Sequence, residues 1–311
     1  MLGSKAIILP KLETTFETDA VPVAADAMLV EDLKLEILGE KGELKPFRGF
    51  YGSYKSIQIG QGLKISFKHH IHGAGAVAVA PPVGKLLRAS NYSETITPTT
   101  GPVDYEPLSD RDGESLTIYF FHHDIVFKAL GCRGNPSSLD LKSAETGAMS
   151  WEFSCRYVAP ADLAFVDPDF GTPPLPPVLQ NAGFTLDTYA AVIDSLSIKG
   201  GNDVKKIPSM NGSDGVKCYD ITNRVVTAEI DPEVVALATK DWIDKWETSA
   251  EMALSCTLGS VAGNKVVITA PAVQIDAAPG FEERENTLTQ KLALACNPTS
   301  AGNDEIKFSF Q

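Results

Sequence analysis

Hydrophobic and polar residues alternate along much of the chain, which is the pattern of a β-strand with one buried and one exposed face. Two segments, Leu63–His72 and Met149–Tyr157, carry the alternation most clearly, and the second is rich in aromatic residues that favour strands. The apolar faces consist of Leu63, Ile65, Phe67 and Ile71 in one segment and of Met149, Trp151, Phe153, Cys155 and Tyr157 in the other. We predict a half-buried strand at each.

Shorter apolar runs predict further strands and the turns between them. Ser115–Phe121 and Ile125–Leu130 are separated only by His122-His123-Asp124, which is the spacing of a short hairpin. Leu139–Lys142 follows Gly134-Asn135-Pro136, a combination typical of a turn. The fold class that we predict is therefore mainly β, an antiparallel sandwich or barrel.

Two segments predict helices that flank the sheets, one in each half of the chain. Asp231-Pro232-Glu233 combines a capping residue, a proline and an acidic residue in the order of a helix start, so we expect a helix from there to Trp246. Its apolar stripe would consist of Val235, Ala238, Trp242 and Trp246. Pro82–Ala89 predicts a shorter helix with Leu86 and Leu87 on its apolar side.

A proline-rich stretch suggests where two domains meet. Between residues 160 and 177 stand Pro160, Pro168, Pro173, Pro174, Pro176 and Pro177, and such a density disfavours strand pairing and favours an extended connector. We predict an N-terminal arm over residues 1–27, a β domain over 28–159, a Pro-rich linker over 160–182 and a second β domain over 183–311. Each half has the order strand, helix, then a closing strand, at Met149–Tyr157 and at Ile306–Phe310, which suggests a divergent internal duplication.

Composition describes a globular protein that does not attract nucleic acid. The chain has 311 residues, 43% of them hydrophobic, and a net charge of −13, most of it in the second half. Clustered Lys and Arg, which neutralise phosphates, are lacking, so binding of DNA is disfavoured while its passage is not. No apolar run approaches the roughly 20 residues of a membrane span, and Met1–Leu12 does not predict a signal peptide.

The five cysteines predict buried thiols rather than a disulfide framework. Their number is odd and no Cys-x-x-Cys pair occurs, so the sequence supports neither paired disulfides nor a zinc site. Cys155, Cys256 and Cys296 stand in apolar stretches, where a free cysteine acts as a small hydrophobic residue. We expect all five to be reduced, in a protein made in cytoplasm.

A series of short segments, in this order and spacing, resembles the major tail tube proteins of long-tailed, siphovirus-like bacteriophages. The segments of the first half are Glu13-Thr14-Thr15-Phe16, Asp19-Ala20, Gly73-Ala74-Gly75, Leu86-Leu87-Arg88-Ala89, Glu94-Thr95, Tyr105–Ser109, Ser115–Phe120, Gly131-Cys132-Arg133-Gly134 and Met149–Tyr157. Weaker segments follow at Gly200-Gly201-Asn202, Arg224, Ile230–Glu233, Gly263–Val266 and Asp304–Lys307. His69-His70-Ile71-His72 departs from the pattern, since an acidic or small residue is expected there.

The resemblance implies a structural virion protein that assembles with itself. Its fold would be two packed antiparallel sheets with a flanking helix, and its subunits would form rings whose inner sheets close one barrel. A duplicated chain would build a ring from three copies with six tube-like units, and an unduplicated one from six copies. The rings would stack into the tail tube through which DNA is ejected, with the tape measure protein and DNA in the lumen and tail-tip and tail terminator proteins at the ends. Met1–Asp26 would form a stacking arm, poorly ordered until it meets a neighbouring ring.

Candidate chemistry is sparse, and we expect no catalytic, cofactor-binding or metal-binding residues. His70 and His72 could offer two imidazoles on one face, but they share it with Lys64 and Lys68, so we favour an exposed polar face over a metal site. His69, His122 and His123 are the remaining histidines; a metal site would become more plausible if the two groups lay on adjacent strands.

Other motifs have ordinary structural explanations. Asp167-Pro168-Asp169 and Asp110-Arg111-Asp112 pair carboxylates as glycosidases do, yet both lie in turn-like sequence. Neither a phosphate-binding loop nor a nucleophile elbow occurs. The alternatives left open are another β-rich virion part, such as a tail-tip hub, a tail terminator or a carbohydrate-binding module, and a metal-dependent hydrolase that uses the histidines. Copy number in the virion and metal content would separate them.

Overall fold

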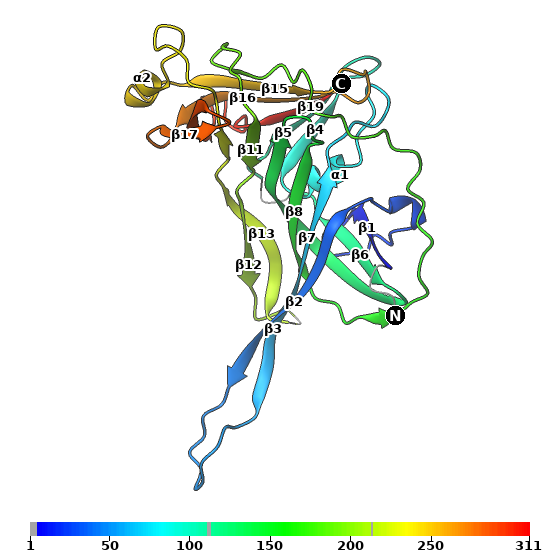
Figure 1. Cartoon of the computed structure of the whole chain (residues 1–311). Coiled ribbons are helices and arrows are strands. Elements are labelled where there is room, and N and C mark those ends of the chain that lie inside the picture. The colour runs from blue at the N-terminus through cyan, green and yellow to red at the C-terminus, as the bar shows by residue number, and fades with distance from the viewer. Residues whose placement is uncertain (1–4, 111–112, 213) are drawn as a thin grey trace.

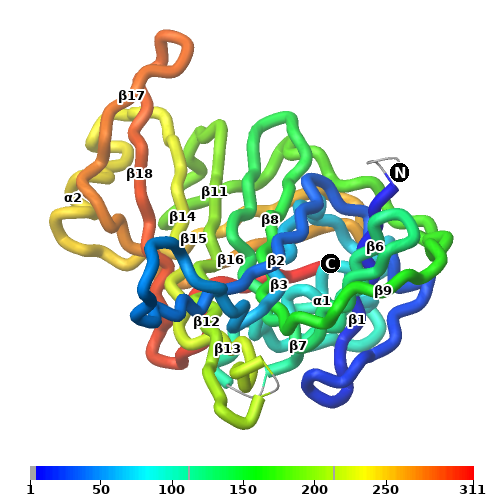
Figure 2. The backbone as a smooth tube through the Cα atoms, turned by 90° about the horizontal axis from the view of Figure 1, so that it is seen from below, coloured from blue at the N-terminus to red at the C-terminus, as the bar shows by residue number. Residues whose placement is uncertain are grey.

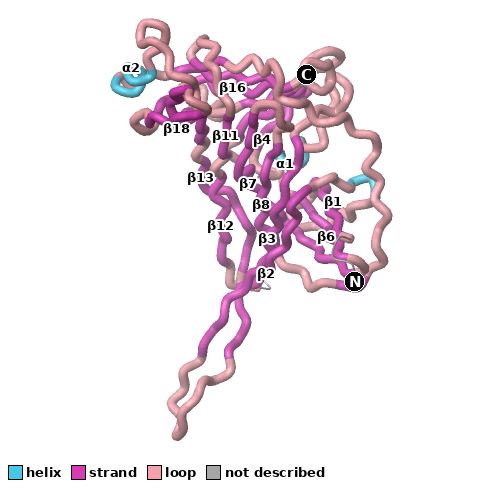
Figure 3. The backbone as a smooth tube through the Cα atoms, in the orientation of Figure 1, coloured by secondary structure: helices cyan, strands magenta, loops and turns pink. Residues whose placement is uncertain are grey.

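The computed structural model describes residues 5–110, 113–212 and 214–311, and it consists mainly of antiparallel strands, as the alternation predicts (Figure 1, Figure 3). The strands of the first half are β1 (Ala6–Leu12), β2 (Glu31–Glu43), β3 (Ser56–His70), β4 (Tyr92–Ile96), β5 (Val103–Pro107), β6 (Leu116–His122), β7 (Ile125–Lys142), β8 (Ala148–Arg156) and β9 (Ala161–Asp162). Those of the second half are β10 (Thr185–Leu186), β11 (Ser195–Lys199), β12 (Asn202–Pro208), β13 (Val216–Arg224), β14 (Thr227–Ile230), β15 (Met252–Leu258), β16 (Val266–Ile275), β17 (Gly280–Arg284), β18 (Thr287–Asn297) and β19 (Lys307–Phe310).

Helical structure in the described residues is limited to three short segments, η1 (Ala24–Asp26), α1 (Gly84–Arg88) and α2 (Trp242–Glu247). In the described ranges, none of them has the length and apolar character that crossing a bilayer requires. The predicted helix at Pro82–Ala89 is confirmed in its central part by α1, which buries Leu86 and Leu87 against the sheets.

The strands predicted from alternation are confirmed. β3 and β8 pair with each other in antiparallel register, and their apolar faces are buried. β6 and β7 form the predicted hairpin, with His122 opposite Ile125. At the end of the chain, Phe308 and Phe310 point into the core from β19, and Ile306 is buried just before it. Alternation was a reliable guide in these places because one face of each strand meets the core and the other does not.

The turn predicted at Gly134-Asn135-Pro136 is wrong, since β7 runs through it without a break. Pro136 lies opposite Trp151 of β8, and the register shifts just after it, between Pro136 and Ser138. A bulge of this kind tolerates a proline inside a sheet because it interrupts the ladder that the missing N–H would have joined. Gly134 is required by packing, because an added Cβ would lie 2.5 Å from the ring of Phe153.

The helix predicted over Asp231–Trp246 is wrong for most of its length. The carboxylate of Asp231 accepts hydrogen bonds from the backbone N–H groups of Asp194 and Ser195, so it fixes the start of β11 instead of capping a helix. The true N-cap is Asp241, whose side chain accepts from the backbone N–H groups of Ile243 and Asp244. Only the last turn and a half of the predicted segment is therefore helical.

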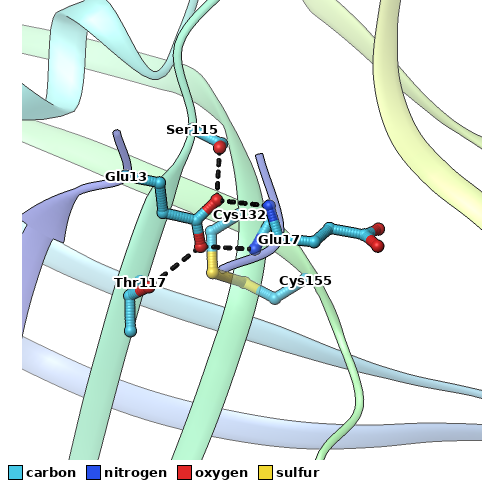
Figure 4. Close-up of a disulfide and its surroundings, with 7 residues drawn as sticks. Glu13, Glu17, Ser115, Thr117, Cys132 and Cys155 are labelled. Carbon is cyan, nitrogen blue, oxygen red and sulfur yellow. Dashed lines mark hydrogen bonds between the residues drawn. A yellow bond between two sulfur atoms is a disulfide. The ribbon is translucent and has the colours of Figure 1, made fainter. Parts of the chain in front are cut away.

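The expectation that all five cysteines are reduced is also wrong. Cys132 of β7 and Cys155 of β8 form a disulfide inside the first half (Figure 4). The ladder between these strands shifts between Leu130 and Arg133, and this irregularity turns Cys132 toward Cys155. The spacing of the cysteines in the sequence does not predict this disulfide, because the irregularity that brings Cys132 to Cys155 belongs to the pairing of the strands. Cys155, Cys256 and Cys296 are buried, as predicted.

The N-terminal segment is packed against the body over the residues that the structure describes. Residues 6–12 form β1, which pairs with β6 along its whole length and buries Ile8 and Leu9 completely. The carboxylate of Glu13 accepts hydrogen bonds from the hydroxyls of Ser115 and Thr117 and from two backbone N–H groups, those of Glu17 and Gly131 (Figure 4). Poor ordering was thus a wrong expectation for residues 5–26, while a stacking role for residues 1–27 stays a prediction.

One large hydrophobic cluster draws side chains from both halves of the chain. The halves are also joined by hydrogen-bonded strands, since β7 pairs with β11 and β5 pairs with β19. Residues 163–177, within the predicted linker, form no regular structure. The division of the chain into two domains at residues 160–182 stays a prediction.

Candidate assembly surfaces

The two halves repeat one plan of strand pairing. The first half is defined here as β1–β9 and the second as β10–β19. The pairs β1–β6, β2–β3, β3–β8, β6–β7, β7–β8 and β7–β9 correspond in order to β10–β15, β11–β14, β14–β18, β15–β16, β16–β18 and β16–β19. A helix follows the third strand of each matched set, α1 after β3 and α2 after β14. Six matching antiparallel pairs are strong support for an internal duplication.

This plan corrects the equivalence that the sequence suggested. The strand that matches β8 is β18 (Thr287–Asn297), whereas Ile306–Phe310 contains β19, the counterpart of the short β9. The sequence comparison was shifted by one strand because β9 has two residues and carries no alternation. Each half also has its own additions, the β4–β5 hairpin in the first and the β12–β13 ribbon in the second.

A continuous path of antiparallel strands crosses both halves, in the order β2-β3-β8-β7-β11-β14-β18-β17. Where the halves meet, Leu139–Lys142 of β7 pair with Ser195–Ile198 of β11, and the hydroxyl of Ser197 donates to Asp140 at 2.7 Å. Among the described residues, β2 pairs only with β3, and β17 only with β18. The path therefore ends in an unpaired strand edge at each side, and the β17–β18 hairpin projects from the body (Figure 2).

One face of this path is polar, and its charges are paired. Cross-strand partners share a face, so the registers place Lys64, Lys68, Glu152, Asp140, Ser197, Glu229 and Lys291 on the same side. Lys64 lies 3.0 Å from Glu152, Lys68 lies 2.8 Å from Asp32 of β2, and Lys291 pairs with Glu229. The hydrogen bond from Lys68 lowers the pKa of Asp32. The opposite face of the path packs into the core.

A long hairpin leaves the body, built from the outer parts of β2 and β3 (Figure 1). Its tip loop, defined here as residues 44–55, exposes large apolar side chains: Phe47 and Tyr51 completely, Phe50 by 70% and Tyr54 by 49%. The guanidinium of Arg48 lies about 5 Å from the rings of Phe50 and Tyr54. Our sequence interpretation missed this hairpin, although four aromatic residues in a polar, glycine-containing segment are an unusual combination that could have drawn attention.

The structure separates the histidines instead of gathering them. His69 and His72 are buried near each other, with ring centroids 5.3 Å apart, and His70 is half-buried beside Glu31 at 3.3 Å. The expected exposed position of His72 is thus wrong, because β3 ends at His70 and the alternation ends with it. His122 is the last residue of β6 and His123 lies in the turn to β7, and β6 pairs with β1 and β7, not with β3. The described residues include no cluster of three or more metal-ligating side chains.

The paired carboxylates occupy turns. Asp167 and Asp169 are exposed, and the side chain of Asp169 accepts a hydrogen bond from the backbone N–H of Gly171, which closes a local turn. Asp110 is exposed as well, while Arg111 and Asp112 lie outside the described residues. No pair of carboxylates in the described part of these motifs faces a cavity, so the turn interpretation is the one that the geometry favours.

The chain matches one family model. Residues 13–296 match the model described as "Phage tail tube protein". No curated protein matches the chain. The match begins at Glu13 and ends at Cys296 in β18, so it includes every strand of the repeated plan except β1 in the first copy and β19 in the second.

Proposed function

Because this chain belongs to the phage tail tube protein family, and so is a structural protein of the virion tail, we propose that its copies join edge to edge into rings that stack into a hollow tail tube. DNA passes through the bore during ejection into the host, and the tape measure protein fills it beforehand. The tube meets tail-tip and tail terminator proteins at its ends. The chain is made in the host cytoplasm and has no catalytic role.

This proposal rests on the pairing of β7 with β11, which joins the two halves and is called the seam here. β7 of the first half pairs with β11, the first path strand of the second half. The counterpart of β7 is β16, and β17 follows β16 along the same edge of β18; the counterpart of β11 is β2. Repetition of the seam between molecules therefore pairs the free edge of β17 with the free edge of β2 of the next copy. Such a head-to-tail contact generates a ring when its rotation closes, and it leaves no exposed edge.

We favour three copies in a ring, since each chain supplies two repeats of the strand plan and three chains supply six. Each seam within a chain would then alternate with an equivalent seam between chains. The polar face of the path would line the bore. Its lysines neutralise many of its carboxylates, as in the pairs Lys64–Glu152 and Lys291–Glu229. DNA phosphates would meet a balanced surface that neither binds nor strongly repels them.

Stacking is assigned to the β2–β3 hairpin. Its tip loop reaches away from the body and carries fully exposed aromatic side chains, which monomeric proteins rarely leave in water. A neighbouring ring would cover them.

The test uses electron microscopy of the concentrated protein and two proline variants of β2. Adjacent residues of a strand direct their N–H groups to opposite edges. One of the variants Leu35→Pro and Glu36→Pro therefore removes an N–H group from the free edge of β2, called the outward variant here, and the other removes an N–H group from the edge that pairs with β3. The outward variant is expected to stay folded and to lose rings, and the wild type to form hollow stacks with threefold symmetry. Rings of six chains would refute the trimer, and dispersed wild-type particles at every concentration would refute the tube.

A further inference from the structure

A cavity of about 480 Å³ lies beside the start of β2, the free edge of the path. It is bounded by the residues that precede β2, by the end of β3, by α1 and by residues 169–173. Leu29, His69, His72 and Lys85 are among the side chains and backbone groups that line it. It is unlike an ordinary surface hollow, because two of its polar side chains are buried and incompletely paired.

Lys85 is the first of these. Its ammonium group donates one hydrogen bond, to the backbone carbonyl of Asp26 at 3.2 Å, and among the described residues it forms no ion pair. Acids do lie near it: the Asp26 carboxylate attracts the ammonium from beyond ion-pair distance, and Glu94 and Asp169 line the same cavity. Burial lowers the pKa of Lys85 to about 8. A largely buried cation without a direct ion pair is costly, so the position beside the Lys85 ammonium favours an anion that enters the cavity.

A lysine near the helix of the second half shows what Lys85 lacks. Lys240 lies just before α2, is largely buried, and pairs with Asp187 at 2.6 Å. Lys245 of α2 reaches the same carboxylate at 3.1 Å. The second half thus gives the lysines near its helix a direct ion pair, and the first half leaves Lys85 without one.

His69 is the second incompletely paired group. Its Nδ1 lies 3.0 Å from the backbone carbonyl of Leu29, so this nitrogen carries the proton and donates it. Its Nε2 is then an acceptor, and it is buried without a partner. An occupant that completes the cavity must offer an acidic group to Lys85 and a donor to His69. A peptide segment with a glutamate offers both, through its side chain and its backbone N–H groups, whereas an anion without a proton, such as sulfate, offers only the first.

The second half contains a related cavity that already has its far wall. This cavity, of about 500 Å³, lies beside the residues that precede β11, as the first one lies beside the residues that precede β2. Leu141 and Ser143, at the end of β7, contribute to its lining across the seam. By the correspondence of the strands, the matching wall of the Lys85 cavity would come from the β16–β18 region of the next copy.

We propose that the Lys85 cavity receives the acidic β17–β18 hairpin of a second copy of this chain, with a carboxylate of Glu282, Glu283 or Glu285 on the Lys85 ammonium. This proposal rests on the edge-to-edge ring proposed above and names the contact that selects the correct neighbour. The three glutamates are exposed, and among the described residues none of them has a lysine or arginine partner within ion-pair distance. Backbone N–H groups of the same hairpin provide the donor that His69 lacks.

A charge exchange tests the contact. Lys85→Glu alone, and the triple change Glu282→Lys, Glu283→Lys and Glu285→Lys alone, are each expected to raise the protein concentration needed for ring formation by at least about tenfold, because each leaves like charges facing each other. Both sets of changes in one chain restore the attraction and are expected to recover most of the loss. Wild-type assembly by both single sets, or no recovery by the combination, would overturn the contact.

A neutral variant separates assembly from folding. Lys85→Met removes a largely buried cation that forms no ion pair among the described residues of the subunit, so the isolated subunit is expected to melt at the same temperature or higher while its rings form less readily. Lys240→Met is the matched control: its subunit loses an ion pair and is expected to melt lower, with ring formation changed no more than that loss explains. A lower melting temperature for Lys85→Met would assign Lys85 to the fold and overturn the proposal.

Chemical cross-linking tests the contact between Lys85 and the β17–β18 hairpin directly. A carbodiimide joins a lysine amine to a carboxylate that it touches, so assembled rings should yield a peptide that links Lys85 to the 282–285 segment, and dilute subunits should not. Rings that form through β2 and β17 without this link would disprove the cavity contact and leave the ring proposal standing. A failure of the wild type to form rings would remove both.

Discussion

The first two path strands of each half are joined by a long insertion, and the two insertions end differently. In the first half, the outer parts of β2 and β3 run away from the body to a tip loop whose Phe47 and Tyr51 are fully exposed. In the second half, the insertion between β11 and β14 forms the β12–β13 ribbon, which is tied to the body. Lys206 donates to the carbonyl of Gly60, and Arg224 pairs with Glu305 at 3.0 Å.

This difference separates what the repeated plan needs from what assembly needs. The tied insertion makes its polar contacts within the subunit, so its removal should lower the stability of the subunit. The free insertion exposes apolar side chains to water and contributes little to the stability of the subunit, so its removal should affect only assembly. The same topological position has therefore acquired an internal role in one half and an external role in the other.

The largest effect should follow from shortening the free insertion. Replacement of residues 44–55 by Asn-Gly joins Glu43 to Ser56, which already lie opposite each other, through a preferred two-residue turn. We expect rings to form, long tubes to be lost altogether, and the free energy of unfolding to change by less than about 0.5 kcal/mol. Electron microscopy and denaturant melts would check this result. Normal tubes from the shortened chain would show that the tip loop does not stack the rings.

The acids that follow the first strand of each half offer a second comparison. Glu13 follows β1 and is buried, with four hydrogen bonds from neutral donors, whereas Asp187 follows β10, is one-third exposed and pairs with two lysines (Figure 4). Removal of Glu13 leaves buried donors without an acceptor, which costs more than the loss of partly screened ion pairs. Equivalent positions thus hold the chain by different means.

We expect Glu13→Ala to lower the free energy of unfolding by about 3 kcal/mol and Asp187→Ala by about 1 kcal/mol. Denaturant titration of both variants beside the wild type measures the difference. Glu13→Gln, which keeps an acceptor oxygen, should recover part of the loss. Equal losses for the two alanine variants would mean that the Glu13 site is no more than a surface contact.

Several features of the fold could be predicted from the residues, and the reasons are local. Alternation located β3 and β8 because each has one face in the core, and Leu86 and Leu87 marked the buried side of α1. The position of α2 was missed because Asp231 resembles a helix cap in the sequence, but its carboxylate accepts hydrogen bonds from the backbone at the start of β11. The disulfide was missed because its two cysteines are 23 residues apart in the sequence and are brought together by an irregularity in the β7–β8 ladder.

The assembly surfaces were harder to predict than the strands for a physical reason. An unpaired edge, such as that of β17, is defined by the absence of a neighbour, and only the complete pairing scheme reveals it. The Lys85 cavity likewise joins residues from six separate segments. The sequence marked the histidines but placed His72 on the wrong face, because the alternation stops where the strand stops.

An effect smaller than that of Glu13 concerns the last buried residue of the strand before each helix, His69 in β3 and Ile230 in β14. Burial lowers the pKa of His69 to about 4, from an ordinary value near 6.5. The unfolded chain therefore binds a proton at higher pH than the folded one, so stability is unaffected above about pH 7 and is lost as the pH falls toward 4.

From pH 8 to pH 5 this one group should remove about 2 kcal/mol of stability. His69→Leu, which makes the first half resemble the second, should abolish that part of the pH dependence, while His123→Leu, at the half-exposed turn between β6 and β7, should leave it in place. Melts at both pH values give the difference between wild type and variant directly. An unchanged pH dependence in His69→Leu would show that His69 becomes protonated in the folded subunit as readily as in water, and the first half would then differ from the second in its partners but not in the titration of its core.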